Sequence, residues 1–258
     1  MTAAGGFATT PAMSLPVLPL DRLDFPYQPW SWPFARERRA EIDAHFARRM
    51  AASGRMWNGR VLLMRDCRID GASLTGTCFE TDFASFLAWR DWEFPGQEVM
   101  NCFAMGALLS ADGAFLLGVM GAHTANAGRV YFPAGTPDPS DIVDEHLDLA
   151  GSVAREVAEE TGLTPADYAP AARWHVVPTG VRLALIRVLA APLAAVELQR
   201  RIRAHLARET HPELADIRIV RGEADFDPMM PPFVTAYLAH WFRGAMSVER
   251  GGAQETLR

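Results

Sequence analysis

The fold is decided by residues 155–163, which read Arg-Glu-Val-Ala-Glu-Glu-Thr-Gly-Leu. The three glutamates, Glu156, Glu159 and Glu160, stand at positions i, i+3 and i+4, so on a helix they share one face. Like charges that close repel one another, but a divalent cation such as Mg²⁺ or Mn²⁺ prefers oxygen ligands and turns the repulsion into attraction. The stretch therefore predicts a metal-binding helix that stops at Gly162. The alternative is a solvated acidic face with a glycine C-cap.

Every position of 155–163 fits the second half of the Nudix box, GX5EX7REUXEEXGU, in which U is a bulky aliphatic residue. The chain therefore resembles the Nudix hydrolases, which cleave a nucleoside diphosphate linked to another moiety. The resemblance covers roughly residues 98–245. It implies an α+β fold, the Nudix-type α/β/α sandwich with a mixed sheet. It also implies that Glu156, Glu159 and Glu160 bind Mg²⁺ or Mn²⁺, and that Arg155 orients one of these carboxylates.

The upstream half of the box departs from the family pattern. In several Nudix enzymes the residue before the box glycine offers its backbone carbonyl to a metal, and Ala134 before Gly135 fits that place; a plain turn at the end of a strand is the alternative. Between Gly135 and Arg155 lie 19 residues where the family has about 13, an insertion of about six. Eight positions before Arg155, where the family has Glu, the chain has Leu147.

This departure puts the outer metal ligand of the box in question. Asp144, Glu145 and Asp148 lie near Leu147 and are candidate substitutes. The insertion indicates a divergent member with a substrate loop of its own. Leu147 also favours a second class of function, a non-catalytic Nudix-fold protein that binds nucleotides as a sensor. Retention of all three helix glutamates favours the enzyme.

Further site residues are candidates by position. Glu223, one of three acids before the last predicted helix, is a candidate general base, with a solvated loop acid as the alternative. Arg129 and Arg182 lie in predicted strands and are candidate phosphate contacts. His123 and His146 lie in predicted loops, where an exposed histidine is more typical than a phosphate contact.

The substrate class is read from the segment before the Nudix-like region. Residues 56–61 and 81–83 are similar to the extra domain of Nudix enzymes that cleave UDP-sugars, with Trp57 as a substrate contact. We therefore expect a UDP-sugar, and a uridine pocket between the two units walled by Trp57, Trp89 or Phe132. ADP-ribose, dinucleotides and acyl-CoA diphosphates are the alternatives.

Periodicity and turn residues divide the chain into an extended Pro- and aromatic-rich arm (1–34), a small N-terminal α/β unit (35–96) and a Nudix hydrolase domain (97–258). Residues 136–148 are predicted to form a loop. Helices are predicted at 35–52, 82–92, 149–162, 192–208 and 231–243, and strands at 60–66, 73–79, 101–109, 114–120, 128–132, 172–177, 181–190 and 216–221.

Composition narrows the class of protein. The 258 residues are 49% hydrophobic and 22% charged, as in an ordinary globular protein, and the net charge of −6 argues against a nucleic-acid coat protein. All 25 basic residues are arginines, so any side chain that grips a phosphate through a formal cation is an arginine. We expect a small-molecule nucleotide as the partner.

The three cysteines, Cys67, Cys78 and Cys102, form no CxxC pair, which favours free thiols in a reducing cytoplasm over a zinc site. The chain lacks a run of 18 apolar residues and a basic, then apolar, N-terminal pattern. We therefore expect a cytoplasmic protein that neither crosses a membrane nor carries a signal peptide. The family resemblance makes a homodimer plausible.

Overall fold

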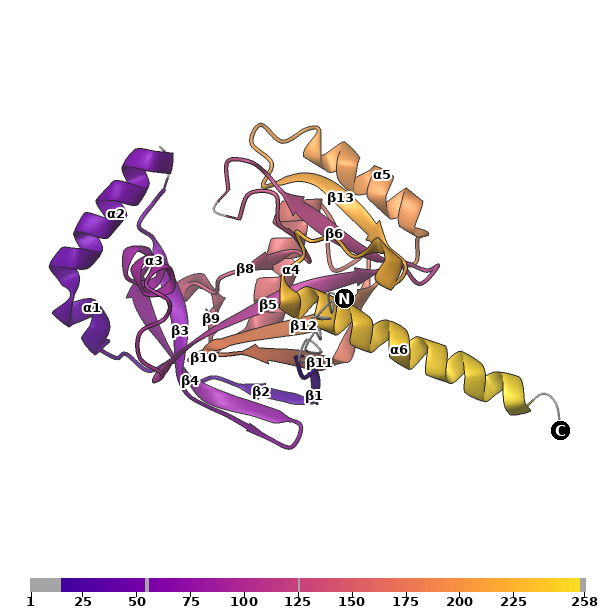
Figure 1. Ribbon diagram of the computed structural model, residues 1–258, viewed down its shortest axis with the longest axis horizontal. Helices are drawn as coiled ribbons and strands as arrows, with labels where there is room; N and C mark the ends of the chain where they lie inside the picture. The colour runs from indigo at the N-terminus through magenta and orange to yellow at the C-terminus, as the bar shows by residue number, and fades with distance from the viewer. Residues whose placement is uncertain (1–14, 54–55, 125, 256–258) are drawn as a thin grey trace, which may run out of the picture.

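The computed structural model describes residues 15–53, 56–124 and 126–255 (Figure 1). It is an α+β fold in which a mixed sheet lies between helices, so the predicted sandwich is confirmed. Helices α4 and α5 cover one face of the sheet and α6 covers the other. None of the described helices is long and apolar enough to cross a membrane. The helices are α1 (Pro33–Glu37), α2 (Arg39–Ser53), α3 (Phe83–Asp91), α4 (Leu149–Thr161), α5 (Ala195–Leu206) and α6 (Pro232–Glu255), with 3-10 turns η1 (Pro139–Asp141) and η2 (Glu223–Asp225).

Strand β5 lies at the centre of the sheet and pairs with four other strands. It pairs in parallel with β12 and antiparallel with β3, β6 and β8. The main path runs β1-β11-β12-β5-β3-β4-β2, and β6 carries β7 and β13 off this path. The strands are β1 (Leu18–Leu20), β2 (Arg22–Asp24), β3 (Arg60–Asp70), β4 (Ser73–Asp82), β5 (Val99–Leu109), β6 (Phe115–Met120), β7 (Val130–Tyr131), β8 (Ala134–Gly135), β9 (Ile142–Val143), β10 (His146–Leu147), β11 (Ala169–Thr179), β12 (Arg182–Ala190) and β13 (Leu214–Val220).

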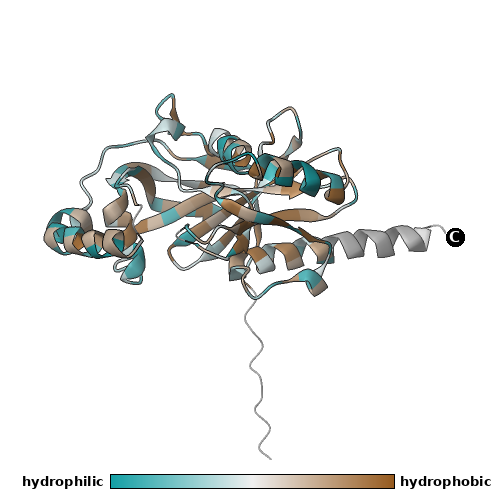
Figure 2. Cartoon of the chain, turned by 90° about the horizontal axis from the view of Figure 1, so that it is seen from above, coloured by the Kyte–Doolittle hydropathy of each residue, from teal (hydrophilic) through white to brown (hydrophobic). Residues whose placement is uncertain are grey.

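Apolar side chains fill both faces of this sheet. Val153 and Val157 of α4 pack into one core, and Val234 and Tyr237 of α6 pack into the other. Helix α4 approaches β5 closely, because a Cβ at Gly106 would lie 2.6 Å from Val157 Cγ2. Figure 2 shows hydrophobic residues gathered along the strands. This close packing at Gly106 sets the distance between α4 and the sheet, and therefore the position of the glutamates on α4.

The N-terminal unit continues the same sheet. The predicted hairpin at Asp70-Gly71 joins β3 to β4, and β3 pairs with the start of β5 through Met64 and Met100. Asp82 caps α3 as predicted, accepting a hydrogen bond from Ser85 N at 2.9 Å. In the arm, β1 pairs with β11 and β2 pairs with β4. In the described part of the arm, β1 and β2 are edge strands and residues 33–34 already belong to α1; residues 1–14 lie outside the described residues.

Two predicted elements were wrong in detail. The single helix expected at 35–52 is two helices, α1 and α2, separated at Arg38. The loop expected at 136–148 contains η1 and a small hairpin of β9 and β10. The other predicted helices and strands are present with shifted ends, and α6 extends to Glu255 where the prediction ended at 243.

Candidate catalytic site

Local sequence fixes both ends of α4. The Asp148 carboxylate accepts hydrogen bonds from Ala150 N at 3.1 Å and Gly151 N at 2.9 Å, which caps the first turn. Gly162 ends the helix with φ of 70°, a left-handed conformation that glycine adopts without strain. The helix between these caps turns Glu156 and Glu160 towards β8.

Glu156 and Glu160 are buried acids held against Ala134 and Gly135. The side chain of Glu156 is 12% exposed, and Glu160 is 4% exposed as a residue. Ala134 N donates a hydrogen bond to Glu160 Oε1 at 3.3 Å. A Cβ at Gly135 would lie 2.2 Å from Glu156 Cδ, so only glycine leaves room for this carboxylate. The two acids and the Ala134-Gly135 backbone therefore form one tightly packed group.

Burial makes these carboxyl groups hard to ionise. Removal from water raises the pKa of Glu156 to about 7, with nearby Glu159 and Glu213 adding to the rise and Arg155 opposing it. Burial likewise raises the pKa of Glu160 to about 9. Glu160 Oε2 has no hydrogen-bond partner among the described residues. A cation bound at Glu160 would stabilise the ionised form of this carboxyl group, so the site favours cation binding.

Glu159 does not join this group. Its side chain is 62% exposed and lies 3.7 Å from Arg155 Nη1. The same Arg155 nitrogen lies 2.8 Å from Glu156 Oε1. Over the described part of the chain, no three His, Cys, Asp or Glu side chains are grouped closely enough to hold an ion by themselves. The structure thus brings Glu156, Glu160 and Ala134 together and leaves Glu159 at the rim.

Arg155 is anchored by Asp141, which the sequence analysis missed. Arg155 Nη2 lies 3.1 Å from both carboxylate oxygens of Asp141, which is 5% exposed. Ser152 Oγ donates a further hydrogen bond to Asp141 Oδ2 at 3.2 Å. Counting forward from Gly135, Asp141 stands at the acidic position of the box, after five intervening residues. The acidic residue could have been found by counting forward from Gly135, whereas counting back from Arg155 leads to Leu147.

The insertion therefore lies after the acidic position, in residues 142–147, which form the β9–β10 hairpin. Asp144 and Glu145 make its turn with φ of 49° and 61°. Leu147 is 8% exposed and packs in the core, so it is a structural residue.

This hairpin docks on the arm. Tyr27 N donates to Glu145 O at 2.7 Å, and Leu147 N donates to Phe25 O at 3.0 Å. His146 Nε2 lies 3.6 Å from Asp24 Oδ1. The inserted residues thus connect the loop before α4 to the N-terminal segment.

The carboxylate that approaches α4 from a later part of the chain is Glu213. It precedes β13, its charge raises the pKa of both Glu156 and Glu160, and Gly121 N donates to its backbone oxygen at 2.7 Å. Glu223 lies beyond the other end of β13, about 20 Å along the strand. The structure therefore places the predicted general base Glu223 away from α4. No local pattern marks Glu213, because the pairing of β13 with β6 brings it there.

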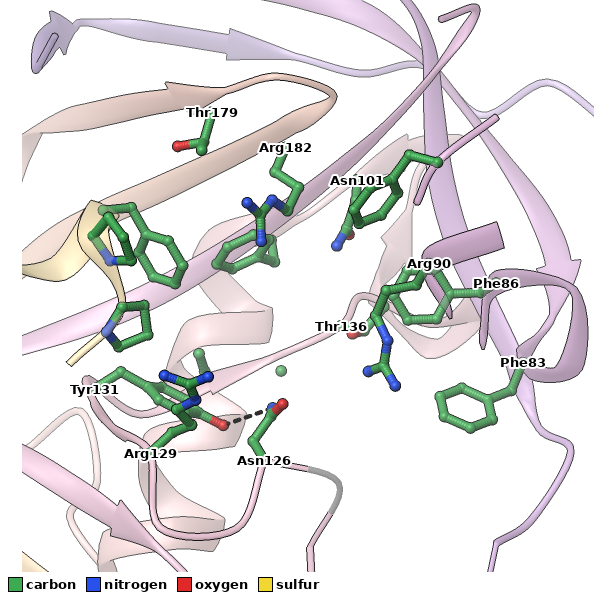
Figure 3. Close-up of a pocket in the computed structure, with 17 residues that line it drawn as sticks. Phe83, Phe86, Arg90, Asn101, Asn126, Arg129, Tyr131, Thr136, Thr179 and Arg182 are labelled. Atoms are coloured by element: carbon green, nitrogen blue, oxygen red, sulfur yellow. Dashed lines mark hydrogen bonds between the residues drawn. The ribbon is translucent and has the colours of Figure 1, made fainter. Parts of the chain in front are cut away.

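A cavity of about 500 Å³ opens beside Ala134 and Gly135 (Figure 3). Arg129 and Arg182, the predicted phosphate contacts, both line it, and Arg90 of α3 lines it from the N-terminal unit. No aspartate or glutamate is among the described residues that line it. The cavity is therefore suited to an anion next to the buried acids. Its lining comprises Phe83, Phe86, Arg90, Phe94, Asn101, Phe103, Asn126, Arg129, Tyr131, Ala134, Gly135, Thr136, Thr179, Arg182, Pro231, Pro232 and Phe233.

The three aromatic residues predicted to wall the pocket do not line this cavity. Trp89 and Phe132 are 1% and 0% exposed and belong to the cores. Trp57 is 85% exposed and lines a neighbouring cavity together with His123 and Glu213. Thr136 borders both cavities, so Trp57 lies on the far side of it. The aromatic side chains of the main cavity are phenylalanines and Tyr131.

Solved structures similar to this chain are Nudix proteins of low identity. A Nudix hydrolase from M. smegmatis is 15% identical with a TM-score of 0.37, covering 57% of this chain and 85% of its own. The MutT protein from Methanosarcina mazei Go1 is 19% identical with a TM-score of 0.37, covering 57% and 95%. A bifunctional NMN adenylyltransferase/ADP ribose pyrophosphatase from Francisella tularensis, complexed with AMP and a Mn ion, is 11% identical with a TM-score of 0.40, covering 62% and 46%.

No protein-family model and no curated protein matches this chain. At the identities and TM-scores of the solved structures, any assignment of function rests on the residues of the chain itself.

Proposed function

We propose that this chain is a divergent Nudix hydrolase that cleaves a nucleoside diphosphate linked to another moiety. The observation that carries the proposal is the burial of Glu156 and Glu160 against Ala134-Gly135, at the edge of a cavity lined by arginines. Buried acids with raised pKa values beside an anion-binding cavity are typical of a site that takes a metal-bound phosphate.

The residues present fit a divalent cation. Mg²⁺ usually keeps several waters and is held by one or two carboxylates together with substrate phosphates, so a full protein cage is not required. Glu156 and Glu160 would supply the carboxylates, and the Ala134 carbonyl would supply a neutral oxygen. Glu160 Oε2, without a partner among the described residues, is a free ligand atom. When bound, Mg²⁺ or Mn²⁺ would polarise the phosphoryl group and lower the pKa of a bound water.

The side chains of this chain then have separate tasks. Arg155, held by Asp141, orients Glu156 and Glu159. Arg129 binds the phosphate oxygens from the cavity side, whereas Arg182, in register with Asn101 of β5, lines the cavity further from Gly135. We propose Glu213 in place of Glu223 as the acceptor of the proton from the attacking water, because Glu213, unlike Glu223, lines the neighbouring cavity beside Thr136 and acts on both α4 acids.

The substrate class proposed first is a UDP-sugar, from the resemblance of residues 56–61. The resemblance counts Trp57 as a substrate contact, but this side chain is 85% exposed and lines the neighbouring cavity, so we assign it no strong contact. ADP-ribose, dinucleotides and acyl-CoA diphosphates are the alternatives. A cytoplasmic location and a homodimer stay predictions of the sequence.

The test is hydrolysis of UDP-glucose, ADP-ribose, a dinucleoside polyphosphate and coenzyme A, each with Mg²⁺ and with a chelator. We expect cleavage of one class only when Mg²⁺ is present, and a fall in kcat of more than about 100-fold for Glu160→Gln. Glu223→Gln is the matched control and should keep wild-type turnover. Equal turnover by wild type and Glu160→Gln would remove the metal-site assignment, and cleavage of ADP-ribose with intact UDP-glucose would end the UDP-sugar assignment.

One observation favours a second candidate, a non-catalytic nucleotide sensor. Arg155 Nη1 already lies 2.8 Å from Glu156 Oε1, where it competes with a metal for that carboxylate. A sensor would bind the same nucleotides and release no product over hours at saturating Mg²⁺. Product release that depends on Glu160 would exclude it.

A further inference from the structure

Helix α3 turns one stripe of side chains towards the cavity. Phe83, Phe86 and Arg90 stand at i, i+3 and i+7 and all line it. The opposite stripe, Ala84 and Ala88, packs in the small core with α2. One face of α3 therefore packs against α2, and the other face lines the cavity (Figure 3).

Phe94, in the turn after α3, lines the same cavity. Both Glu93 and Phe94 have φ of 60°, a left-handed conformation that is strained for residues with a Cβ. Phe94 N donates to Trp89 O at 2.8 Å, and its ring meets Trp89 edge-on at 4.8 Å. The guanidinium carbon of Arg182 lies 5.7 Å from the centre of the Phe94 ring. The strained backbone at Glu93 and Phe94 thus places the Phe94 ring beside the cavity.

Polar side chains from three neighbouring strands form a row next to Phe94. Asn101 of β5 pairs in register with Arg182 of β12, which pairs in register with Thr179 of β11. Asn101 Oδ1 and Thr179 Oγ1 are buried and have no hydrogen-bond partner in the part of the chain that the structure describes. Asn101 is only 8% exposed. Unpartnered buried polar atoms are costly, and a ligand in the cavity would satisfy them.

The distance along β5 matches a nucleotide. Ala104 pairs with Gly135 at the catalytic end, and Asn101 lies three residues before it, which is about 10 Å of strand. That length accommodates a ribose between a phosphate at Gly135 and a base at Asn101. Arg129 lines the same cavity and lies beside Tyr131, away from Asn101 (Figure 3).

We propose that the cavity is a nucleoside phosphate subsite in which the N-terminal unit selects the base. The base lies against Phe94 and the α3 stripe, its edge bonds to Asn101 and Thr179, and its phosphate faces Arg129. The direction of the nucleotide rests on the proposed function, which places the reacting phosphate at Gly135. The binding itself needs neither metal nor turnover.

The test is calorimetric binding of UMP, AMP and ribose 5-phosphate to the full, metal-free chain. Ribose 5-phosphate carries the same phosphate without a base. We expect UMP or AMP to bind about tenfold tighter than ribose 5-phosphate, because stacking and edge hydrogen bonds act only on the base. Neither nucleotide binding more tightly than ribose 5-phosphate would overturn the proposal.

Variants separate the two halves of the subsite. Phe94→Leu keeps an apolar side chain without an aromatic face, and Asn101→Ala removes the edge contact. Each should cut the advantage of the nucleotide to less than about threefold and leave ribose 5-phosphate binding unchanged. Arg129→Gln is the matched control and should weaken all three ligands alike. An unchanged advantage in both Phe94→Leu and Asn101→Ala would overturn the proposal even in a protein that hydrolyses diphosphates.

The opposite result is also informative. A nucleotide advantage that depends on Phe94 and Asn101, in a protein that cleaves no diphosphate, would support the subsite and contradict the proposed hydrolase. The two proposals therefore fail independently.

Discussion

Helices α3 and α4 are built alike at their starts and differ in what they present to the cavity region. Each begins with an aspartate N-cap, Asp82 in α3 and Asp148 in α4. Helix α4 turns carboxylates towards Ala134-Gly135. Helix α3 turns two phenylalanines and Arg90 towards the cavity, which Ala134 and Gly135 also line. The acids proposed for catalysis and the aromatic wall proposed for recognition therefore come from different parts of the chain.

The inserted hairpin links these two units. Residues 142–147 extend from the end of η1, which holds Asp141, to the arm at Phe25 and Tyr27. Leu62 N of β3 also donates to Pro137 O at 2.7 Å, close to Gly135. The loop before α4 is therefore braced by the N-terminal unit, so the wall and the acids keep a fixed spacing.

The largest expected effect separates the two regions directly. In Gly135→Ala the new Cβ would lie 2.2 Å from Glu156 Cδ and must displace that carboxylate. We expect kcat to fall by more than about 100-fold, while the nucleotide advantage over ribose 5-phosphate stays within threefold of wild type. Gly222→Ala is the control, since a Cβ there meets no described atom within 4 Å. Loss of nucleotide binding together with activity would show that the regions are not separable.

A smaller loss is expected when the support of Arg155 is removed. Asp141→Asn keeps the shape of the side chain and loses the charge that holds Arg155. We expect a 10- to 100-fold lower kcat, which is about the effect of removing a residue that orients a metal ligand. Steady-state kinetics with Mg²⁺ measures it. Asp144→Asn, at the nearby hairpin turn where Asn tolerates a positive φ, should act like wild type; a larger loss there than in Asp141→Asn would contradict the assignment.

The buried acids also predict how stability depends on pH. The folded pKa of Glu160, about 9, lies above its ordinary value of 4.5, so the folded state binds the proton more tightly. Between about pH 5 and about pH 9, the unfolding free energy of the metal-free protein should therefore be highest at pH 5 and fall as the pH rises. Glu160→Gln should flatten this fall and be more stable by about 1 to 3 kcal/mol at pH 8.

Urea unfolding at several pH values measures this effect. Added Mg²⁺ should oppose the fall, because the metal binds the ionised carboxylates and its affinity rises with pH. Stability that rises with pH in the metal-free wild type over this window would show that Glu160 is not buried as an acid.

The smallest effect is expected at Trp57. Its side chain is 85% exposed and lines only the neighbouring cavity. Trp57→Ala should change KM by less than about threefold, as for an exposed residue outside the main subsite. A rise in KM above tenfold would instead assign the second moiety of the substrate to that cavity and support the sequence prediction for Trp57.

Sequence reasoning was successful where neighbours in the chain decide the outcome. The glycine stop of α4, the Asp82 cap of α3 and the hairpin at Asp70-Gly71 depend on residues a few positions apart, and each was predicted. The acidic partner of Arg155 was missed because an insertion shifts every count made across it. Counting from Gly135 reaches Asp141 without crossing the insertion.

The sequence by itself determined the helix 149–161, its acidic face and its glycine stop, because helical spacing and capping are local properties. Only the tertiary structure decided which acids are buried: Glu156 and Glu160 face β8 while Glu159 faces solvent. It alone brought Glu213 near α4, and Phe94 and Arg90 to the cavity, because strand pairing and helix packing join residues far apart in the chain. The cost of removing a carboxylate from water is likewise set by that packing, so the raised pKa values belong to the fold.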